Sequence, residues 1–377
     1  MIEGLGRVLI VGGGIGGMAA AIALRKRDVP VEMVEIGPEW KVYGAGITIT
    51  GPTLRAFRDL GLFDSIAEHG FFSKGGHMFL FNGKLLSETV TPPIEPGLPA
   101  SGGIMRPRLH QIMSDEVKRL GTEVRIGVGP ATIEQDDDGV DVVFTDGRNG
   151  RYDLVIAADG IYSKVRTLLF GNEAAQPVYS GQMSWRVVAP RPPEMDVAHF
   201  FMGHPKYVGG INPCSKTEVY AFFLHPEPNP RRIPDDEKAE YLRSLMSDFG
   251  GSMAVVRDGI GPESSIVQRP FEYLFQPRPW HKGRVVLIGD AAHATTPHLA
   301  SGAGIAVEDA LVLPQELEKA NGDIEAALEA FTERRYERCK FVVDSSVAIA
   351  KRQLEGAPAE EIGMRMGQAM QRLATPI

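Results

Sequence analysis

The chain has 377 residues, of which 43% are apolar and 23% are charged, so its composition is that of a globular protein with a substantial core. Its formal net charge of −8 offers no basic surface for nucleic acid or an anionic membrane, and no apolar run approaches the length of a membrane span. We therefore expect a protein of the cytoplasm, working as a monomer or homodimer, with no nucleic-acid or membrane partner.

The first predicted element is a βαβ unit. Residues 8–11 have the pattern of a buried strand, 12–17 form a glycine turn, 18–26 favour a helix, and 31–34 indicate a second strand. The turn contains G-x-G-x-x-G directly after a strand and at the start of a helix. That context makes the pattern typical of dinucleotide binding, although by itself it does not distinguish FAD from NAD.

Each glycine of this turn has a separate predicted task. Gly12 makes the tight turn, Gly14 lets the backbone approach a pyrophosphate, and Gly17 permits close packing of the helix on the strand. The unpaired N–H groups of the helix N-terminus then face the phosphates. Glu35 ends the second strand, where its carboxylate can accept hydrogen bonds from the adenosine ribose hydroxyls.

The remaining elements follow in three blocks. Two apolar runs, 154–157 and 285–288, are typical of fully buried strands, and each leads into a corner of aspartate and glycine. Between about 175 and 275 prolines multiply and short alternating strands appear, which predicts an antiparallel sheet. Residues 303–355 have the pattern of long amphipathic helix, with a kink expected at Pro314.

Three motifs in a fixed order carry a resemblance that covers nearly the whole chain. They are the glycine turn, the Asp159-Gly160 corner and the Gly289-Asp290 corner. Their order resembles that of the flavoprotein aromatic hydroxylases, the single-component (class A) FAD monooxygenases of the p-hydroxybenzoate hydroxylase type. The resemblance implies an α/β fold with a Rossmann-like FAD-binding domain, an inserted antiparallel β-sheet substrate domain and C-terminal helices. We expect the FAD-binding domain in residues 1–174 and 276–377, and the substrate domain in residues 175–275.

The resemblance also assigns residues to FAD. Asp159-Gly160 is implied to lie near the pyrophosphate, and Asp290 to bind the ribityl chain, which NAD lacks. The implied cofactor-binding residues are Gly12, Gly14, Gly17, Glu35, Gly46, Arg106, Asp159, Gly160, Gly289, Asp290, Pro297, Gly302, Ala303 and Gly304. The sequence has Ala300-Ser301 where the family often has Gly-Gln. Plainer interpretations exist for single members: Asp159 can be a helix cap, Arg106 a surface arginine, and His293 is interpreted as structural.

The implied reaction uses NADH or NADPH and O2. The coenzyme reduces FAD, the reduced flavin captures O2 as a C4a-hydroperoxide, and one oxygen atom passes to a small aromatic or N-heteroaromatic ring. A phenol or hydroxypyridine-like substrate is expected, because the sequence contains no cluster of arginines that would clamp a benzoate. Alternatives in the same fold are a halogenase or a reductase-like enzyme. The W-x-W-x-I-P stretch of halogenases is absent.

Candidate catalytic residues are less strongly indicated. A phenolic substrate is activated by removal of its proton, so a histidine or tyrosine within hydrogen-bond reach can act as base or relay. His204 and Tyr207 are the pair favoured for this task. The family resemblance implies that Thr48 and Pro297 also face the substrate. The alternative is that His204 and Tyr207 are ordinary residues of the sheet.

Further predictions concern a tryptophan, an arginine and the two cysteines. We interpret Trp185 as a packing residue and Arg186 as a contact at the entrance of the site. The two cysteines, Cys214 and Cys339, fit no metal spacing and no disulfide framework, so buried thiols and no metal site are expected.

Overall fold

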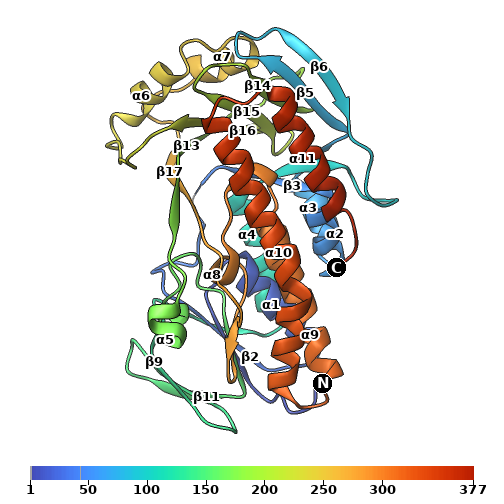
Figure 1. The fold of residues 1–377 in the computed structure, drawn as a ribbon, viewed down its shortest axis with the longest axis vertical. Helices are drawn as coiled ribbons and strands as arrows, with labels where there is room; N and C mark the ends of the chain where they lie inside the picture. Colours follow the sequence, from blue (N-terminus) through green and yellow to red (C-terminus); the bar gives the residue numbers. More distant parts are fainter. Residues whose placement is uncertain (1, 43) are drawn as a thin grey trace.

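The computed structural model describes residues 2–42 and 44–377. A mainly parallel sheet lies in the lower half of the view in Figure 1. Its strands are β1 (Val8–Val11), β2 (Val31–Glu35), β8 (Glu123–Ile126), β12 (Leu154–Ala157), β18 (His281–Lys282) and β19 (Val285–Leu287). Their spatial order is β18-β19-β12-β1-β2-β8, and only the pair β18 and β19 is antiparallel. The predicted Rossmann-like fold is therefore confirmed.

The centre of this sheet is buried on both faces, which explains the continuous apolar runs of its strands. Every residue of β1, β12 and β19 is buried. Helix α1 (Ile15–Arg25) packs between this sheet and its helical neighbours, and its contacts are with α4 (Arg106–Arg119) and α9 (Gly302–Lys319). The alanine-rich sequence of α1 permits this close approach, because small side chains let two helices come near each other.

A second, mixed sheet lies in the upper half of Figure 1. Its strands are β5 (Gly75–Leu80), β6 (Leu85–Val90), β13 (Val178–Pro190), β14 (Ala198–Met202), β15 (Val208–Pro213), β16 (Glu218–Pro226) and β17 (Ile266–Tyr273). Their order is β17-β13-β16-β15-β14-β5-β6, with β14 and β5 parallel and the other neighbours antiparallel.

The mixed sheet begins near the predicted boundary at residue 175 but draws on more of the chain than expected. Strands β5 and β6 come from residues 75–90, within the part predicted as FAD-binding. All six residues of β6 are exposed, so this edge strand lacks the buried face that produces a readable alternation of apolar residues.

The two faces of the mixed sheet have different surroundings. The outer face is covered by α6 (Lys238–Leu245) and α7 (Gly251–Asp258), which lie over the sheet at the top of Figure 1. Trp185, Phe201 and Phe223 point to this side and form a core with Phe249. The predicted packing role of Trp185 is confirmed, since the residue is fully buried there. The inner face carries the intervening residues of the same strands and faces the rest of the molecule.

Smaller elements join the two sheets. A second sheet of the FAD-binding part has the order β3-β7-β4, and a third has the order β11-β10-β9. The bounds of these strands are β3 (Gly46–Thr50), β4 (Phe71–Ser73), β7 (Ser101–Met105), β9 (Pro130–Gln135), β10 (Val140–Phe144) and β11 (Asn149–Tyr152). The short helices and 3₁₀ turns are α2 (Gly51–Asp59), α3 (Phe63–His69), α5 (Lys164–Phe170), η1 (Gly171–Glu173), α8 (Asp290–His293) and η2 (Pro297–Leu299).

The C-terminal part is helical, as predicted. The long stretch divides into α9 and α10 (Ile324–Leu354), because Asn321 and Gly322 both adopt positive φ between the helices. Pro314 lies inside α9. Helix α10 runs along the molecule from the parallel sheet to the mixed sheet (Figure 1). In the described part of the chain, none of the helices has the length and apolarity needed to span a bilayer.

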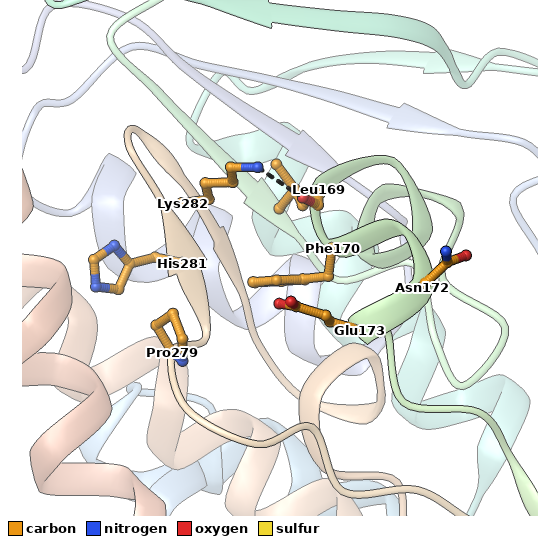
Figure 2. Close-up of a pocket in the computed structure, with 7 residues that line it drawn as sticks. All are labelled: Leu169, Phe170, Asn172, Glu173, Pro279, His281 and Lys282. Atoms are coloured by element: carbon orange, nitrogen blue, oxygen red, sulfur yellow. Dashed lines mark hydrogen bonds between the residues drawn. The ribbon is translucent and has the colours of Figure 1, made fainter.

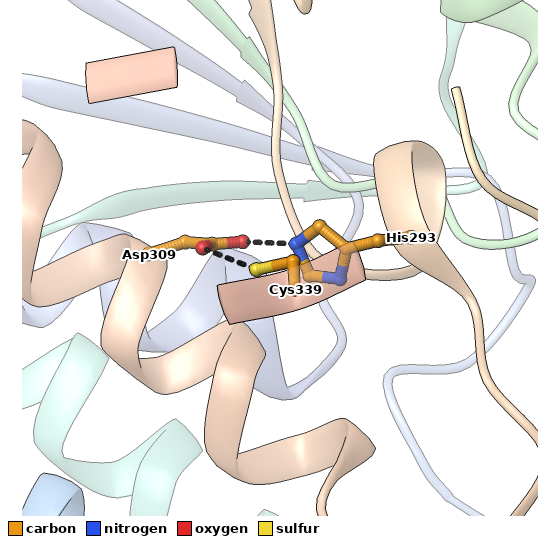
Figure 3. A group of neighbouring side chains, drawn as sticks. All are labelled: His293, Asp309 and Cys339. Carbon is orange, nitrogen blue, oxygen red and sulfur yellow. Dashed lines mark hydrogen bonds and ion pairs between the residues drawn. The ribbon is translucent and has the colours of Figure 1, made fainter. Parts of the chain in front are cut away.

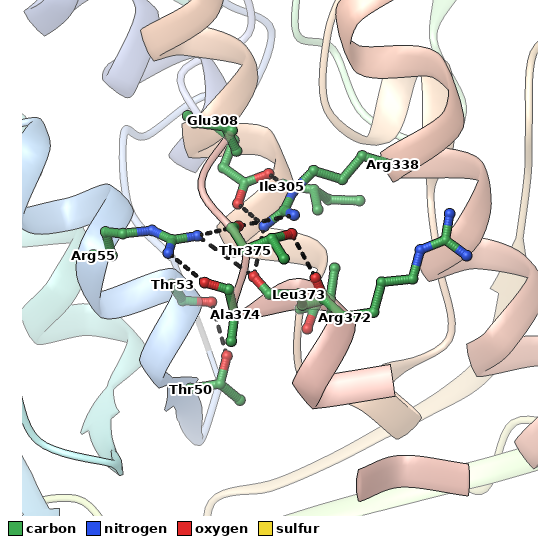
Figure 4. Close-up of polar contacts among 12 residues, drawn as sticks. Thr50, Thr53, Arg55, Ile305, Glu308, Arg338, Arg372, Leu373, Ala374 and Thr375 are labelled. Atoms are coloured by element: carbon green, nitrogen blue, oxygen red, sulfur yellow. Dashed lines mark hydrogen bonds and ion pairs between the residues drawn. The ribbon is translucent and has the colours of Figure 1, made fainter. Parts of the chain in front are cut away.

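The end of the last helix, α11 (Ala359–Leu373), is fixed by two arginines, of which Arg55 is buried and Arg338 is partly buried (Figure 4). Arg55 of α2 donates hydrogen bonds of 2.7 Å to the carbonyl oxygens of Ala374 and Thr375. Arg338 of α10 donates to the carbonyl oxygen of Leu373 at 2.9 Å. These guanidinium groups satisfy carbonyls that a helix C-terminus leaves unpaired, and thereby fasten α11 to α2 and α10.

Candidate functional site

The three motif corners meet at one edge of the parallel sheet. Residues Val11, Ala157 and Leu287 are register partners at the carboxyl ends of β1, β12 and β19. The next residues along the chain continue the pairing, because Ala158 N donates to Val11 O at 2.8 Å and Ile288 N donates to Ala157 O at 2.9 Å. The three corners therefore lie side by side where open α/β sheets bind their ligands.

The glycine turn has the geometry predicted for it. A Cβ atom on Gly12 would clash with the carbonyl of Ala158, and one on Gly17 would clash with the carbonyl of Gly12. Gly14 is exposed, is the N-cap of α1, and has no atom within 4 Å of the place where a Cβ would lie. The helix N-terminus is thus open on the side of Gly14, and no side chain caps it.

Glu35 lies beside this turn and already holds the local backbone. Its carboxylate accepts hydrogen bonds from Gly13 N at 2.8 Å and from Gly37 N at 2.7 Å, one on each oxygen. A carboxylate has about four acceptor positions, so both oxygens can still accept from ribose hydroxyls. The side chain is partly exposed, which leaves it reachable by a ligand.

The Asp159 carboxylate is used within its own turn. It accepts a hydrogen bond from Ser163 Oγ at 2.5 Å and another from Val165 N at 3.1 Å, and Ser163 is the N-cap of α5. Burial raises the pKa of Asp159 above its usual value. The N-cap of α5 is therefore Ser163 and not Asp159, and Asp159 stabilises the turn that leads into the helix. Gly160, by contrast, has no atom within 4 Å of the position that a Cβ would take, and it leaves the corner open.

Arg166, for which the sequence suggested no task, connects the second corner to the third. Its guanidinium is buried and donates to the carbonyl oxygen of Ile161 at 2.8 Å and to that of Ala291 at 2.9 Å. Ile161 follows Gly160 and Ala291 follows Asp290. One side chain thus fixes the spacing between the two aspartate-glycine corners.

The third corner exposes the Asp290 side chain. Gly289 has φ of +58°, a value that favours glycine, and it directs the chain into α8. The Asp290 side chain is accessible although protein surrounds it, and this enclosure raises its pKa. A side chain that is surrounded by protein and yet exposed lies in a concavity, so we infer a hollow at Asp290 and use this name for it below. Arg106 lies near enough for their charges to interact.

A buried charge network supports the third corner from behind (Figure 3). Asp309 of α9 accepts hydrogen bonds from Gly289 N at 2.9 Å, from His293 Nε2 at 2.6 Å and from Arg335 Nε at 2.8 Å. Burial opposes ionisation, but His293 and Arg335 hold the pKa of Asp309 below its usual value. Against the effect of burial, Cys339 and Asp309 raise the pKa of His293 well above its ordinary value. Because it accepts from Gly289 N, Asp309 fixes the backbone of the Gly289-Asp290 corner.

This network agrees with the structural interpretation of His293, which is fully buried. The Cys339 thiol lies 3.5 Å from the Arg335 guanidinium, and both cysteines are free and buried as predicted. His293, Asp309 and Cys339 offer atoms close enough together for a metal ion. Arg335 already binds one carboxylate oxygen of Asp309, and His293 binds the other. We therefore interpret the group as a buried ion-pair network rather than a metal site.

The turn into α9 completes this side of the hollow. Pro297 opens η2 and is exposed, while Gly302 and Ala303 are partly accessible at the N-terminus of α9, which no side chain caps. Gly304 is buried instead, and a Cβ there would clash with the side chain of Thr53 in α2. Gly304 is therefore a packing position. The free N–H groups of the first turn lie around Gly302 and Ala303.

The inner face of the mixed sheet supplies the opposite wall. The Thr48 hydroxyl of β3 lies 2.6 Å from the Tyr220 hydroxyl and accepts a hydrogen bond from Asn212 Nδ2 at 2.8 Å. Gly46 has room for no side chain, because a Cβ would clash with Tyr220. The sequence singled out Thr48, and the structure surrounds it with Tyr220 and Asn212 of β16 and β15. Phe200 and Phe222 have ring centroids 6.4 Å apart on the same face.

Two arginines lie together in this hollow, which the sequence did not indicate. Arg106 opens α4 and Arg186 lies on β13, yet the charge of Arg186 acts on Arg106. Burial, reinforced by this repulsion, lowers the pKa of Arg106 to about 10. Among residues 2–42 and 44–377, the Nε atom of Arg106 is buried and has no hydrogen-bond partner. The expectation that no arginine cluster exists is therefore wrong, because the fold brings the start of α4 near β13, although Arg106 and Arg186 are 80 positions apart in the chain.

His204 and Tyr207 lie elsewhere. Their rings stack on each other with centroids 4.5 Å apart, and His204 also stacks on Phe249 at 5.6 Å. Tyr207 contacts Phe223 with centroids 5.2 Å apart. Phe223 and Phe249 belong to the core under α6 and α7, so this pair faces the outer side of the mixed sheet. The structure does not bring His204 or Tyr207 together with Thr48, because the turn between β14 and β15 folds toward α7.

A separate surface cleft is drawn in Figure 2. It lies between α5 with η1 and the β18 edge of the parallel sheet, and it is lined by Leu169, Phe170, Asn172, Glu173, Pro279, His281 and Lys282. Lys282 Nζ donates across it to the carbonyl oxygen of Leu169 at 3.3 Å. None of the predicted site residues lines this cleft, so it is distinct from the hollow at the three corners.

The residues around the hollow fit a bound FAD. Gly14 and Gly160 leave open backbone at the sheet edge where a pyrophosphate would approach. Asp290 offers an accessible, enclosed acceptor for ribityl hydroxyls, and Arg106 carries an orphaned buried donor. An unpaired buried donor is costly, so a ligand that accepts from Arg106 removes a real penalty.

Comparisons with known proteins agree with this geometry. Residues 6–346 match the family model described as FAD binding domain. YetM of Bacillus subtilis, named as an FAD-dependent monooxygenase, is 32% identical over 355 residues, covering 94% of this chain and 95% of YetM. The 2-heptyl-3-hydroxy-4(1H)-quinolone synthase of Pseudomonas aeruginosa is 33% identical, covering 81% of this chain and 79% of the synthase. The crystal structure of Klebsiella pneumoniae HpxO with FAD and uric acid is similar with a TM-score of 0.83 and 26% identity, covering 98% of this chain and 92% of HpxO.

Proposed function

The chain belongs to the FAD binding domain family of FAD-dependent monooxygenases, and from that membership we propose that it hydroxylates a small aromatic or N-heteroaromatic ring. NADH or NADPH serves as the reductant and O2 as the oxygen source. The proposal is carried by the open backbone and exposed acceptor of the three corners together with the aromatic side chains and hydroxyl pair on the inner face of the mixed sheet. One wall has the open backbone and acceptor that FAD requires, and the other has aromatic side chains and a hydroxyl pair.

We assign the cofactor to the wall built from the parallel sheet. The pyrophosphate lies on the open backbone at Gly14 and Gly160, Glu35 accepts from the ribose, and Asp290 accepts from the ribityl chain. Arg106 donates to the flavin end of the cofactor through its unpaired Nε. When bound, FAD supplies the redox chemistry and the activation of O2, while the protein supplies position, dryness and charge.

The substrate ring is assigned to the inner face of the mixed sheet. Phe200 and Phe222 offer apolar surface to a planar ring. Tyr220 is buried and burial raises its pKa, so its phenol stays protonated at neutral pH and can donate a hydrogen bond. Asn212 donates to Thr48, and Thr48 can in turn donate to Tyr220, which frees the phenol proton for an oxygen on the ring.

The direction of this hydrogen-bond chain can reverse during the reaction. Each hydroxyl has one donor and two acceptor positions, so Thr48 and Tyr220 can exchange donor and acceptor roles without moving a heavy atom. A proton leaving a ring hydroxyl can thereby be accepted at Tyr220 as the phenol proton passes to Thr48 and the Thr48 proton passes to solvent water, which can reach this partly exposed side chain. We therefore place the proton relay at Thr48 and Tyr220 rather than at His204 and Tyr207.

The names of the relatives support a heteroaromatic substrate. One makes a hydroxylated quinolone, and the similar structure contains uric acid. Both are flat rings that carry oxygen and nitrogen, as the hydroxypyridine-like class predicted from the sequence does. A flat ring with a ring oxygen is the kind of ligand that Phe222 and Tyr220 can hold together.

The test is oxidation of NADH and NADPH by the FAD-loaded protein in the presence of a panel of hydroxylated benzenes, pyridines and quinolines. The proposal expects at least one ring to accelerate coenzyme oxidation several-fold and to appear as a hydroxylated product. A rate that no ring accelerates, with hydrogen peroxide as the only product of O2, contradicts it. Halide incorporation or saturation of a double bond in place of hydroxylation would support the halogenase or reductase alternative.

A further inference from the structure

We propose that the inner face of the mixed sheet carries an apolar subsite beside the ring site, and that the substrate ring bears a long apolar chain that lies along it. The inference rests on the proposed function, because it adds a substituent to the ring that the same site takes. The subsite consists of Phe200 and Met202 of β14 and Met78 of β5, and it is called the apolar floor below.

The strand register places the apolar floor in line with the ring site. Phe222, against which the ring is assigned, is paired with Gly210 of β15, and Gly210 is paired with Phe200. Phe200 is paired in turn with Met78, so one cross-strand row connects Phe222 to Met78. Neighbouring strands are about 4.8 Å apart, and the row therefore extends about 14 Å from Phe222.

The alternation along the strands fixes the face on which the floor lies. Phe201 belongs to the outer core, and successive residues of a strand point to opposite faces, so Phe200 and Met202 point inward. On β5, Phe79 stacks on Phe201 with ring centroids 5.4 Å apart, which places the adjacent Met78 on the inner side. The floor and the ring site therefore share one face of the sheet.

Two glycines let the aromatic rings lie low over this face. A Cβ atom on Gly210 would lie 2.4 Å from Cζ of Phe222. A Cβ atom on Gly76 of β5 would lie 3.1 Å from Cε2 of Phe200. Each ring thus extends across the backbone of another strand, where a side chain would push it away from the sheet. The row presents a low apolar surface to the space on the inner side.

The apolar floor lacks a partner within the protein. Phe200, Met78 and Met202 are all partly exposed. In the part of the chain that the structure describes, none of these three side chains packs in or against a buried hydrophobic cluster. Apolar side chains that lie together and remain accessible to water are typical of a binding surface, because covering them removes apolar area from water.

Continuity with the ring site identifies what covers the floor. The row begins at Phe222 and ends at Ser87 of β6, which is exposed on the edge strand at the upper right of Figure 1. A chain attached to the ring can therefore run over Phe200 and Met78 toward the open edge of the sheet. No charged residue lies in this row between Phe222 and Ser87, so an alkyl or alkenyl chain is stabilised there and a charged substituent is not.

The test measures binding to the oxidised, FAD-loaded protein by isothermal titration calorimetry, without coenzyme and without turnover. The probes are two homologous series, 4-alkylphenols and 6-alkyl-3-hydroxypyridines, each with methyl, propyl, pentyl and heptyl chains. We expect binding in at least one series to tighten about two- to fourfold for each added methylene. Met78→Ser should weaken binding of the heptyl compound by at least about fivefold and leave the methyl compound within about twofold, because only a long chain reaches Met78.

Two further variants make the result specific. Phe200→Ala should weaken binding from the propyl compound onward and spare the methyl compound. Val255→Ser, at an exposed valine of α7 on the outer side of the sheet, should bind both series as the unchanged protein does. Retention of FAD and an unchanged midpoint of thermal unfolding show that each variant is folded, and either floor variant alone suffices for the test.

Three results would overturn the proposal. The first is heptyl compounds that bind no more tightly than methyl compounds in both series. The second is a floor variant that weakens all chain lengths equally or keeps the full dependence on chain length. The third is a protein that is dimeric by sedimentation and becomes monomeric in Met78→Ser, since a second copy would then cover the floor. Chain-dependent binding without any ring-stimulated coenzyme oxidation would instead refute the proposed function and leave the apolar subsite standing.

Discussion

Replacing Asp309 with asparagine removes the negative charge at the centre of the buried network while keeping the size of the side chain. The carboxylate accepts from Gly289, His293 and Arg335, and the residue is fully buried. An asparagine amide presents a donor where a second acceptor is needed. At least one of the three donors is then left unpaired, and the two cations lose their shared anion.

The expected loss is large because the broken pairs are buried. Removing one partner of a buried ion pair costs about 3–5 kcal/mol of the free energy of unfolding. At about 2.1 cal/mol/K per residue, the unfolding entropy of a chain of 377 residues is about 0.8 kcal/mol/K, so the midpoint of thermal unfolding should fall by about 4–6 °C. Gly289 is one of the three donors, so FAD should also bind more weakly.

The effect should depend on pH in a defined direction. Against the effect of burial, Cys339 and Asp309 raise the folded-state pKa of His293, so its stabilising charge is fully present below the unfolded value of about 6.5 and is lost as pH rises through the folded value. The pKa of Asp309 is lowered, so its contribution is present above about 3.9 and is lost only as pH falls through its folded value. The stability difference between the two proteins should therefore grow as pH falls from about 8 to about 5.

The assay is thermal unfolding of the FAD-loaded and FAD-free forms of both proteins across this pH range, with FAD affinity measured by flavin fluorescence. Asp344→Asn is the matched control, since Asp344 is an exposed aspartate of α10 whose contact is with Lys340. It should change the midpoint by less than about 1 °C, as exposed ion pairs contribute little. An Asp309→Asn protein with an unchanged midpoint and unchanged FAD affinity would refute the reasoning.

Two shorter predictions address the walls of the hollow. Asp290→Ala should leave the protein folded but weaken FAD binding about 10–100-fold, because a hydrogen bond to a charged group contributes about 1.5–3 kcal/mol; full retention of flavin after gel filtration would count against the assignment. Tyr220→Phe should keep FAD and lower kcat for hydroxylation by at least about tenfold, since it removes the relay hydroxyl. If that variant forms product at the rate of the unchanged protein, Tyr220 has no part in proton transfer.

The sequence was most informative where function depends on local backbone geometry. The glycine turn, Asp159-Gly160 and Gly289-Asp290 could be recognised because each task is performed by residues adjacent in the chain. Their juxtaposition followed from the parallel arrangement of β1, β12 and β19, which the buried apolar runs already indicated. Thr48 was predicted from the family resemblance rather than from a local pattern.

The supporting and substrate residues were harder to predict because their partners are distant in the chain. Arg335 acts on Gly289 only through Asp309, and Arg166 joins two corners through backbone carbonyls that have no sequence signature. The Arg186 side chain could be assigned to a face only once Trp185 was known to lie on the outer side. The missed signal was the alternation along β13, in which a tryptophan and an arginine are adjacent.

The choice of His204 and Tyr207 failed for a related reason. In a turn between strands, side chains do not alternate between the two faces of the sheet. The face on which His204 and Tyr207 lie therefore depends on which elements cover the sheet. Here Phe249, just before α7, provides an aromatic surface on the outer side, and both rings pack there. The contacts that decide this were not readable from residues 199–212 alone.

The central claim is that this chain inserts one atom of O2 into an aromatic ring held against Tyr220. Its most direct test is to run the FAD-loaded protein with NADH or NADPH, a ring that accelerates coenzyme oxidation, and ¹⁸O2, and to measure the mass of the product. We expect one ¹⁸O atom in each product molecule and a marked loss of this product in Tyr220→Phe. Product whose new oxygen comes from water, or coenzyme oxidation that yields only labelled hydrogen peroxide with every ring, would contradict it.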